Sequence, residues 1–150
     1  AYGAFCYDYT LKTFAYLYNA DITPQVISSQ VRHIDFMPTI LEMLDIPINT
    51  SFEKLDGKSL MPIINGQNIS EELAFSETGN PLNEKEPPKS PNTKSIRNSK
   101  WKLIHNEHND TKELYDLESD PDEENNLIGK NSEIEKEFSK ELLKYTNDKN

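Results

Sequence analysis

The chain has 150 residues, a length that fits one hydrophobic core or slightly more but hardly two full domains. Charged residues make up 28% and the formal net charge is −10, which argues against a nucleic-acid partner because phosphate binding requires a basic face. No run of about 18 apolar residues and no signal peptide occurs, so the sequence predicts no membrane partner.

The first half of the chain begins with an apolar, aromatic run over residues 10–19, which predicts a buried strand. A helix is predicted after the next loop, because apolar residues recur at i, i+3, i+4 and i+7: Met37, Ile40, Leu41 and Leu44. Asp35 stands at its expected N-cap, and Pro47 ends it. A strand followed by a helix is the ordinary unit of an α/β sheet.

Residues 48–72 are predicted to be mostly loop, with one short helical turn around Leu60, Ile63 and Ile64. A strand is predicted over 73–78. Residues 79–93 contain four prolines and few apolar side chains, which predicts a long exposed loop.

From residue 94 the pattern predicts an antiparallel meander with strands at 94–98, 100–105 and 112–117 and turns at 98–99 and 106–111. Its expected buried residues are Trp101, Leu103, Leu114 and Leu117. An amphipathic helix is predicted over 132–146, with a capping box of Ser132 and Glu135. We expect its apolar stripe to pack on the meander rather than on a separate helix. The stripe comprises Ile134, Phe138, Leu142 and Tyr145.

An acidic motif links the last predicted strand to this helix. Asp120 is expected to cap a short helical turn that begins at Pro121 and has Glu123 at its third position. Asn126 would end the turn, and Leu127 would return to the core. The motif therefore predicts a structural role and no chemistry.

Several side chains invite a chemical interpretation. Cys6 lacks a neighbouring base that would lower its pKa, which favours a structural thiol over a nucleophile. His105 and His108 lie at a predicted hairpin turn rather than at the i, i+4 spacing of helical metal ligands. Asp35 beside His33 is explained as a helix cap without catalysis. Residues 120–126 lack the central glycine of an EF-hand calcium loop.

Three stretches, in this order, are similar to segments of one known family. Residues 31–47 match through Val31, Asp35, Pro38, Thr39, Leu41, Ile46 and Pro47, with Asp45 in place of the usual glycine. Residues 55–67 match through Asp56, Gly57, Ser59, Leu60, Pro62 and Gly66. Residues 95–127 match through Arg97, Trp101, Lys102, Leu103, Ile104, Glu113 to Leu117, Asp120, Pro121, Glu123, Asn126 and Leu127. Together they resemble the C-terminal part of the sulfatase family, in the alkaline-phosphatase-like superfamily.

This resemblance implies an α/β fold. Residues 1–72 would end the main sulfatase-like sandwich, and residues 73–150 would form a small antiparallel four-stranded sheet with a packed C-terminal helix. The family hydrolyses sulfate esters with a formylglycine, made from the Cys or Ser of a C/S-x-P-x-R motif, and with a calcium ion. Cys6 lacks that motif's proline and arginine, so the resemblance assigns no catalytic residue and no metal ligand to this chain.

We therefore expect the C-terminal fragment of a sulfate-ester hydrolase that is inactive alone and whose partner is a missing N-terminal catalytic portion. Glu77, Thr78 and Asn80 are the candidate residues of the substrate rim, because loops that leave a strand edge often carry specificity. Three alternatives stay open: a self-contained acidic binding module, a phosphate or phosphonate ester hydrolase of the same superfamily, and a degenerate sulfatase-like protein. The sequence does not indicate a compartment.

Overall fold

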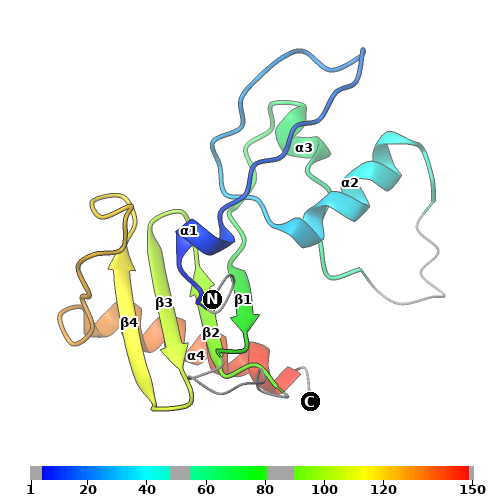
Figure 1. Ribbon diagram of the computed structural model, residues 1–150. Coiled ribbons are helices and arrows are strands. Elements are labelled where there is room, and N and C mark those ends of the chain that lie inside the picture. Colours follow the sequence, from blue (N-terminus) through cyan, green and yellow to red (C-terminus); the bar gives the residue numbers. More distant parts are fainter. Residues whose placement is uncertain (1–4, 48–54, 81–89, 149–150) are drawn as a thin grey trace. The chain divides into compact units, whose positions relative to one another are not determined.

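The computed structural model describes residues 5–47, 55–80 and 90–148 (Figure 1). The chain forms two compact units. The first combines Ala1–Ala15 with Leu73–Asn150, and the second comprises Tyr16–Glu72. The assignment of residues 1–72 to the end of a main domain stays a prediction.

The first unit contains an antiparallel sheet in the strand order β1-β2-β3-β4. The strands are β1 (Ala74–Thr78), β2 (Thr93–Arg97), β3 (Trp101–Asn106) and β4 (Thr111–Asp116). Each strand pairs with the next along the chain, as a meander requires. The predicted turn after β2 is confirmed, because the Asn98 side chain accepts hydrogen bonds from the N–H groups of Lys100 and Trp101.

Side chains alternate between the two faces of this sheet. One apolar row crosses all four strands, because Phe75, Ile96, Leu103 and Leu114 occupy paired positions. Helix α4 (Ser132–Asp148) packs on this row and buries Phe138 and Leu142. The predicted fold class is confirmed, as is the packing of the helix stripe on the meander.

The other face of the sheet is covered by the N-terminal segment, which contains the one-turn helix α1 (Asp8–Leu11). Figure 1 shows α1 and α4 on opposite sides of the strands. A second, smaller core forms here from Cys6, Ile104, Tyr115 and Leu117. The sheet is therefore enclosed between two layers that come from opposite ends of the chain.

Two sequence predictions at the ends of this unit are wrong. Residues 10–19 form no strand: α1 includes residues 10 and 11, and residues 12–19 have no regular structure. No strand in the described part of the chain pairs with them, so Phe14 and Tyr16 stay 95% and 85% exposed. The capping box also fails, since Ser132 lies inside α4 and the carboxylate of Glu135 accepts from the N–H of Gly129 instead.

The second unit contains the 3₁₀ turn η1 (His33–Asp35), α2 (Phe36–Met43) and α3 (Met61–Ile64), which confirms the predicted helix and the short helical turn. Asp45 follows α2 with φ of 52°. This left-handed conformation ends helices and favours glycine, which explains why the resembled family carries glycine at this place.

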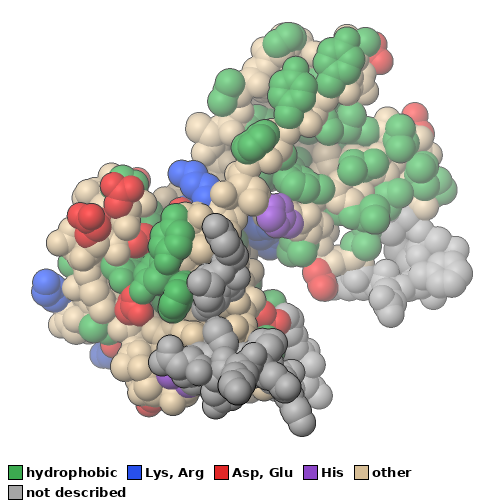
Figure 2. All heavy atoms as spheres, in the orientation of Figure 1, with side chains coloured by type: hydrophobic (Ala, Val, Ile, Leu, Met, Phe, Trp, Pro, Cys, Tyr) green, Lys and Arg blue, Asp and Glu red, His purple; other side chains and the backbone are tan. Residues whose placement is uncertain are grey.

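The predicted apolar stripe of α2 is only partly buried. Met37 and Leu44 are 58% and 63% exposed, whereas Pro38 and Thr39 are buried. Figure 2 shows hydrophobic side chains gathered on the surface of this unit. None of the helices in the described ranges combines the length and the apolar character that crossing a bilayer requires.

Candidate functional site

Four charged side chains meet on the sheet face that α1 covers: Asp8, Arg97, Lys102 and Glu123. We call these four residues the ionic cluster. Lys102 Nζ lies 2.8 Å from Asp8 Oδ1 and 2.8 Å from Glu123 Oε1. Arg97 Nη1 donates to Asp8 Oδ1 and Oδ2 at 2.7 and 2.6 Å. The Lys102 side chain is 0% exposed, so these two acids are the partners of a fully buried cation.

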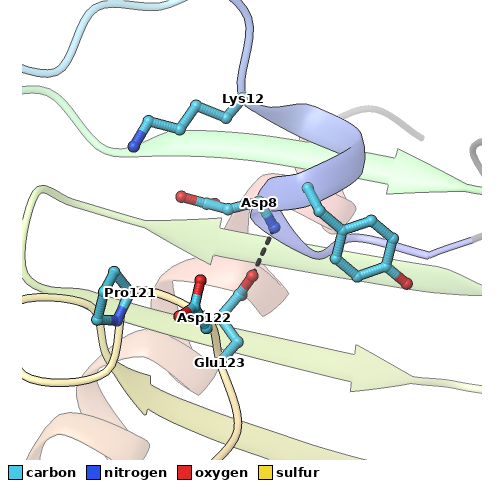
Figure 3. Close-up of a pocket in the computed structure, with 6 residues that line it drawn as sticks. Asp8, Lys12, Pro121, Asp122 and Glu123 are labelled. Carbon is cyan, nitrogen blue, oxygen red and sulfur yellow. Dashed lines mark hydrogen bonds between the residues drawn. The ribbon is translucent and has the colours of Figure 1, made fainter.

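Glu123 reaches the cluster because of the turn that follows β4. Its φ of 57° turns the chain so that its carboxylate points back to α1, and Glu123 Oε2 accepts a hydrogen bond of 2.5 Å from the backbone N–H of Asp8 (Figure 3). The predicted helical turn at 121–126 is therefore wrong, because a residue with positive φ cannot continue a helix. Asp120 still binds backbone groups as expected, accepting from the N–H groups of Glu124 and Asn125 at 3.1 and 2.9 Å.

The return of the chain after this turn agrees with the sequence prediction. Asn126 Oδ1 accepts from the N–H groups of Leu114 and Ile128 at 3.0 and 2.9 Å. The N–H of Leu127 donates to the Leu114 carbonyl at 2.7 Å, and the Leu127 side chain packs against the α4 core. The acidic motif thus closes one edge of the sheet.

The charges of the ionic cluster balance one another. Burial raises the pKa of the Asp8 carboxyl, but the hydrogen bond and charge of Lys102, followed by those of Arg97, outweigh burial and hold this pKa below its ordinary value. Asp8 therefore stays ionised at neutral pH. Removal of either acid would leave a buried cation with too little compensation, which costs several kcal/mol in proteins.

A second polar group fixes α1 on the same face. Glu113 Oε2 accepts hydrogen bonds of 2.6 Å from the phenols of Tyr7 and Tyr115, and Glu113 Oε1 accepts one of 2.9 Å from Asn106 Nδ2. Burial, followed by the bond to Glu113, raises the pKa of both phenols. The phenols therefore act as hydrogen-bond donors, and Tyr7 and Asp8 together attach α1 to the sheet.

An open pocket borders the ionic cluster (Figure 3). Its lining residues are Asp8, Tyr9, Lys12, Pro121, Asp122 and Glu123. None of them is a serine, threonine, cysteine or histidine. The pocket therefore supplies neither a nucleophile of the serine, threonine or cysteine type nor an imidazole base. Its two buried carboxylates, on Asp8 and Glu123, are already bound to cations.

Asp35, in the second unit, stands at the predicted N-cap position of α2, but its side chain has a different role from the one predicted. Its side chain makes no cap hydrogen bond to α2. Instead, Asp35 Oδ1 accepts from Arg32 Nη2 at 2.8 Å and from the N–H of Lys58 at 2.9 Å. Burial raises the pKa of Asp35, but the hydrogen bonds from Arg32 and Lys58 outweigh it and hold the pKa below its ordinary value. Asp35 thus pairs with Arg32 and links η1 to the loop before α3.

The three candidate rim residues lie at the end of β1 and just beyond it. Glu77 and Thr78 are the last two residues of β1, and the Glu77 side chain is exposed. Asn80 is held through its backbone, because its N–H donates to Asn92 Oδ1 at 2.7 Å and its carbonyl accepts from Asn92 Nδ2 at 2.9 Å. Whether these residues border a substrate stays a prediction.

The remaining candidates have structural surroundings. Cys6 is 1% exposed, and burial raises the pKa of its thiol, which disfavours the thiolate that a nucleophile needs. His105 Nε2 lies 2.8 Å from Asp110 Oδ1 within the β3–β4 hairpin. Across residues 5–47, 55–80 and 90–148, no three His, Cys, Asp or Glu side chains are grouped as a metal site. The resemblance assigns the calcium ion to the intact protein, so its presence there stays a prediction.

The sequence indicated Arg97, Lys102 and Glu123 as motif residues but not that their side chains form one cluster with Asp8. Lys102 alternates with Leu103 in β3 and so lies on the face opposite α4. Ile104 and Tyr115 share that face and are buried, so their apolar character was the available signal that this face is covered as well. No sequence signal indicated that Asp8 covers it.

Comparison with known proteins gives one family match. The family model described as N-sulphoglucosamine sulphohydrolase, C-terminal, matches residues 4–148. No curated protein matches the chain.

Several solved structures are similar to this chain. A protein of Bacteroides thetaiotaomicron assigned as a sulfatase is 25% identical with a TM-score of 0.62, and the match covers 76% of this chain and 24% of that one. A 2-O GAG sulfatase is 25% identical with a TM-score of 0.61 and the same coverage. The phosphonate monoester hydrolase of Agrobacterium radiobacter, at 19% identity and a TM-score of 0.55 over 76% of this chain and 24% of that one, shares the fold. The chain thus spans about a quarter of the length of these structures.

Proposed function

Since the chain belongs to the family of the C-terminal portion of N-sulphoglucosamine sulphohydrolase, we propose that it is the C-terminal portion of a sulfate-ester hydrolase. The match over residues 4–148 carries this proposal. The ionic cluster supports it, because Arg97, Lys102 and Glu123 come from the stretch that resembles sulfatases, and they contact one another directly or through Asp8.

In this proposal the chain supplies structure and the catalytic groups come from other parts of the protein. The described pocket is lined by no serine, threonine, cysteine or histidine, and burial disfavours the thiolate of Cys6. A formylglycine and a calcium ion would supply the attack on the ester and the charge stabilisation in the intact protein, and no described residue is assigned to hold either group. The 150 residues alone would then be inactive.

The surface of the second unit supports a large apolar partner. Met37 and Ile40 on α2 and Leu44 at its C-cap are 58%, 45% and 63% exposed, although they belong to the predicted apolar stripe. An unpaired apolar stripe on a helix is typical of a docking face. We propose that the catalytic portion of the same protein covers it, since the similar structures are about four times as long as the matched region.

The substrate that we propose is a sulfated amino sugar. A structure at 26% identity and a TM-score of 0.51 is a complex with D-glucosamine-2-N,6-O-disulfate as substrate, and another similar protein is a 2-O GAG sulfatase. Glu77, Thr78 and Asn80 are the proposed rim residues. Because rim contacts mainly affect binding, Glu77→Ala in the intact enzyme is expected to raise KM with little change in kcat, whereas Glu124→Ala is expected to change neither.

The test is an assay of the intact protein from the native gene. It compares release of sulfate from glucosamine N-sulfate and glucosamine 6-sulfate with hydrolysis of a phosphonate monoester. Turnover of a sulfated sugar supports the proposal. Turnover of the phosphonate alone would replace it with a phosphonate hydrolase, and the absence of any turnover would favour a degenerate enzyme or an acidic binding module.

A further inference from the structure

Two segments more than a hundred residues apart cover the same face of the sheet. The first is residues 5–12, which we call the strap, and the second is the turn at 118–125. Their direct contact is the 2.5 Å hydrogen bond from the N–H of Asp8 in the strap to Glu123 Oε2 in the turn. Both segments also bind Lys102 of β3, at 2.8 Å each.

The two faces of the sheet are stabilised by different interactions. The α4 face buries five apolar side chains in one cluster. Under the strap the buried groups are more polar, since they include Thr93, Ser95 and the fully buried Lys102. Charged and hydrogen-bonded contacts thus take a larger share in fixing the strap than in fixing α4.

Lys102 binds Asp8 of the strap and Glu123 of the turn. The pairing of each acid therefore changes when the other segment moves. If the strap leaves, Lys102 and Glu123 lose Asp8, and Arg97 loses its carboxylate partner. If Glu123 is neutralised, Lys102 loses one of its two counter-charges and the Asp8 N–H loses a charged acceptor. A buried cation with incomplete pairing is strongly unfavourable, so both segments should open together.

We propose that residues 5–12 are a strap that opens separately from the α4 core, and that Lys102 and Glu123 are the positioning residues that hold strap and turn closed as one unit. This part of the inference is independent of the proposed function. Its consequence for an enzyme rests on the proposed function. In the closed state, the strap would fix the position of the polypeptide that directly precedes it.

Cys6 provides a direct probe of strap opening. It is the single cysteine of the chain, lies in the strap and is 1% exposed, so a thiol reagent can label it only after opening. Labelling of the Cys6 peptide is measured by mass spectrometry in the intact protein from the native gene and normalised to the rate in urea. Hydrogen exchange of the Leu103 amide, in the central strand β3, reports opening of the α4 core in the same samples.

Glu123→Gln is expected to raise the labelling rate of Cys6 by about tenfold or more, since a hydrogen bond to a charged group is lost. Asp8→Asn should act likewise, and the double variant should exceed the single variants by less than the product of their effects. Exchange at Leu103 should change much less than labelling. The matched controls, Glu124→Gln and Asp122→Asn, alter exposed acids of the same turn and should leave labelling within about twofold.

The unmodified protein gives a test that requires no variant. The equilibrium constant for opening that is obtained from Cys6 labelling should be at least about tenfold larger than the constant obtained from Leu103 exchange. Equal opening of Cys6 and Leu103 would show that the strap does not open separately, and would overturn the inference. So would a Glu123→Gln variant that labels at the rate of the Glu124→Gln control.

Discussion

Replacement of Lys102 by methionine tests the energetic weight of the ionic cluster. Methionine is unbranched like lysine, is shorter by one heavy atom and carries no charge. Asp8 would retain Arg97, but Glu123, whose side chain is 2% exposed, would lose the cation at 2.8 Å. Breaking a buried pair in this way costs about 3–5 kcal/mol, because one buried charge is left uncompensated. That is a large part of a typical folding free energy of about 5–15 kcal/mol.

Urea unfolding measures this loss, with the fluorescence of the single tryptophan, Trp101, in the neighbouring position as the signal. Lys100→Met is the matched control: Lys100 is 44% exposed and pairs with Glu118 at 2.9 Å on the surface. Its loss is expected to shift the urea midpoint far less than Lys102→Met does, because an exposed ion pair is screened by solvent. Adding Glu123→Gln to Lys102→Met should recover part of the stability. Equal midpoints for the two lysine variants would refute the role assigned to the cluster.

Four further predictions follow from the packing, the backbone and the charges. Phe138→Ala is expected to lower the free energy of unfolding by about 3–5 kcal/mol in the urea experiment, whereas Leu143→Ala, at a residue 62% exposed, should cost far less. Asp45→Gly is expected to stabilise the second unit by about 1 kcal/mol, because Asp45 has φ of 52°, a conformation that favours glycine. Circular dichroism should show a higher melting temperature, and a lower one would contradict this backbone argument. Acid should destabilise the fold, because folding lowers the pKa values of Asp8 and Asp35. Their contribution to the free energy of unfolding is complete above the ordinary Asp pKa of about 3.9 and is lost as the pH falls through the pKa values of the folded state. A pH titration of stability should therefore show a fall below about pH 4 that is smaller in Asp8→Asn. Finally, the 150-residue chain should release no sulfate from an aryl sulfate, with or without calcium, and calcium-dependent turnover would contradict the proposal that the catalytic groups lie in other parts of the protein.

The parts of the fold that depend on local pattern could be predicted from the sequence. The alternation in β2, β3 and β4 and the apolar stripe of α4 gave the meander and its helix within one or two residues. The core row at Leu103 and Leu114 followed from the same alternation.

Features that depend on distant partners were not predictable in this way. Residues 10–19 have the composition of a strand, but a strand forms only beside a hydrogen-bonding neighbour, and local sequence does not reveal its absence. Glu123 fits the third position of a helical turn, yet its carboxylate binds Lys102, which is remote in sequence, and the backbone follows with a positive φ. The family motif could therefore be found as a pattern, whereas its physical reason became visible only in the folded chain.

The most direct test of the central claim is the sequence of the native gene upstream of Ala1. If the chain is the C-terminal portion of a sulfate-ester hydrolase, that reading frame should encode a C/S-x-P-x-R motif and a pair of aspartates able to bind calcium. A natural start of translation close to Ala1, or an upstream region without a nucleophile motif, would contradict the claim and favour a non-catalytic acidic module.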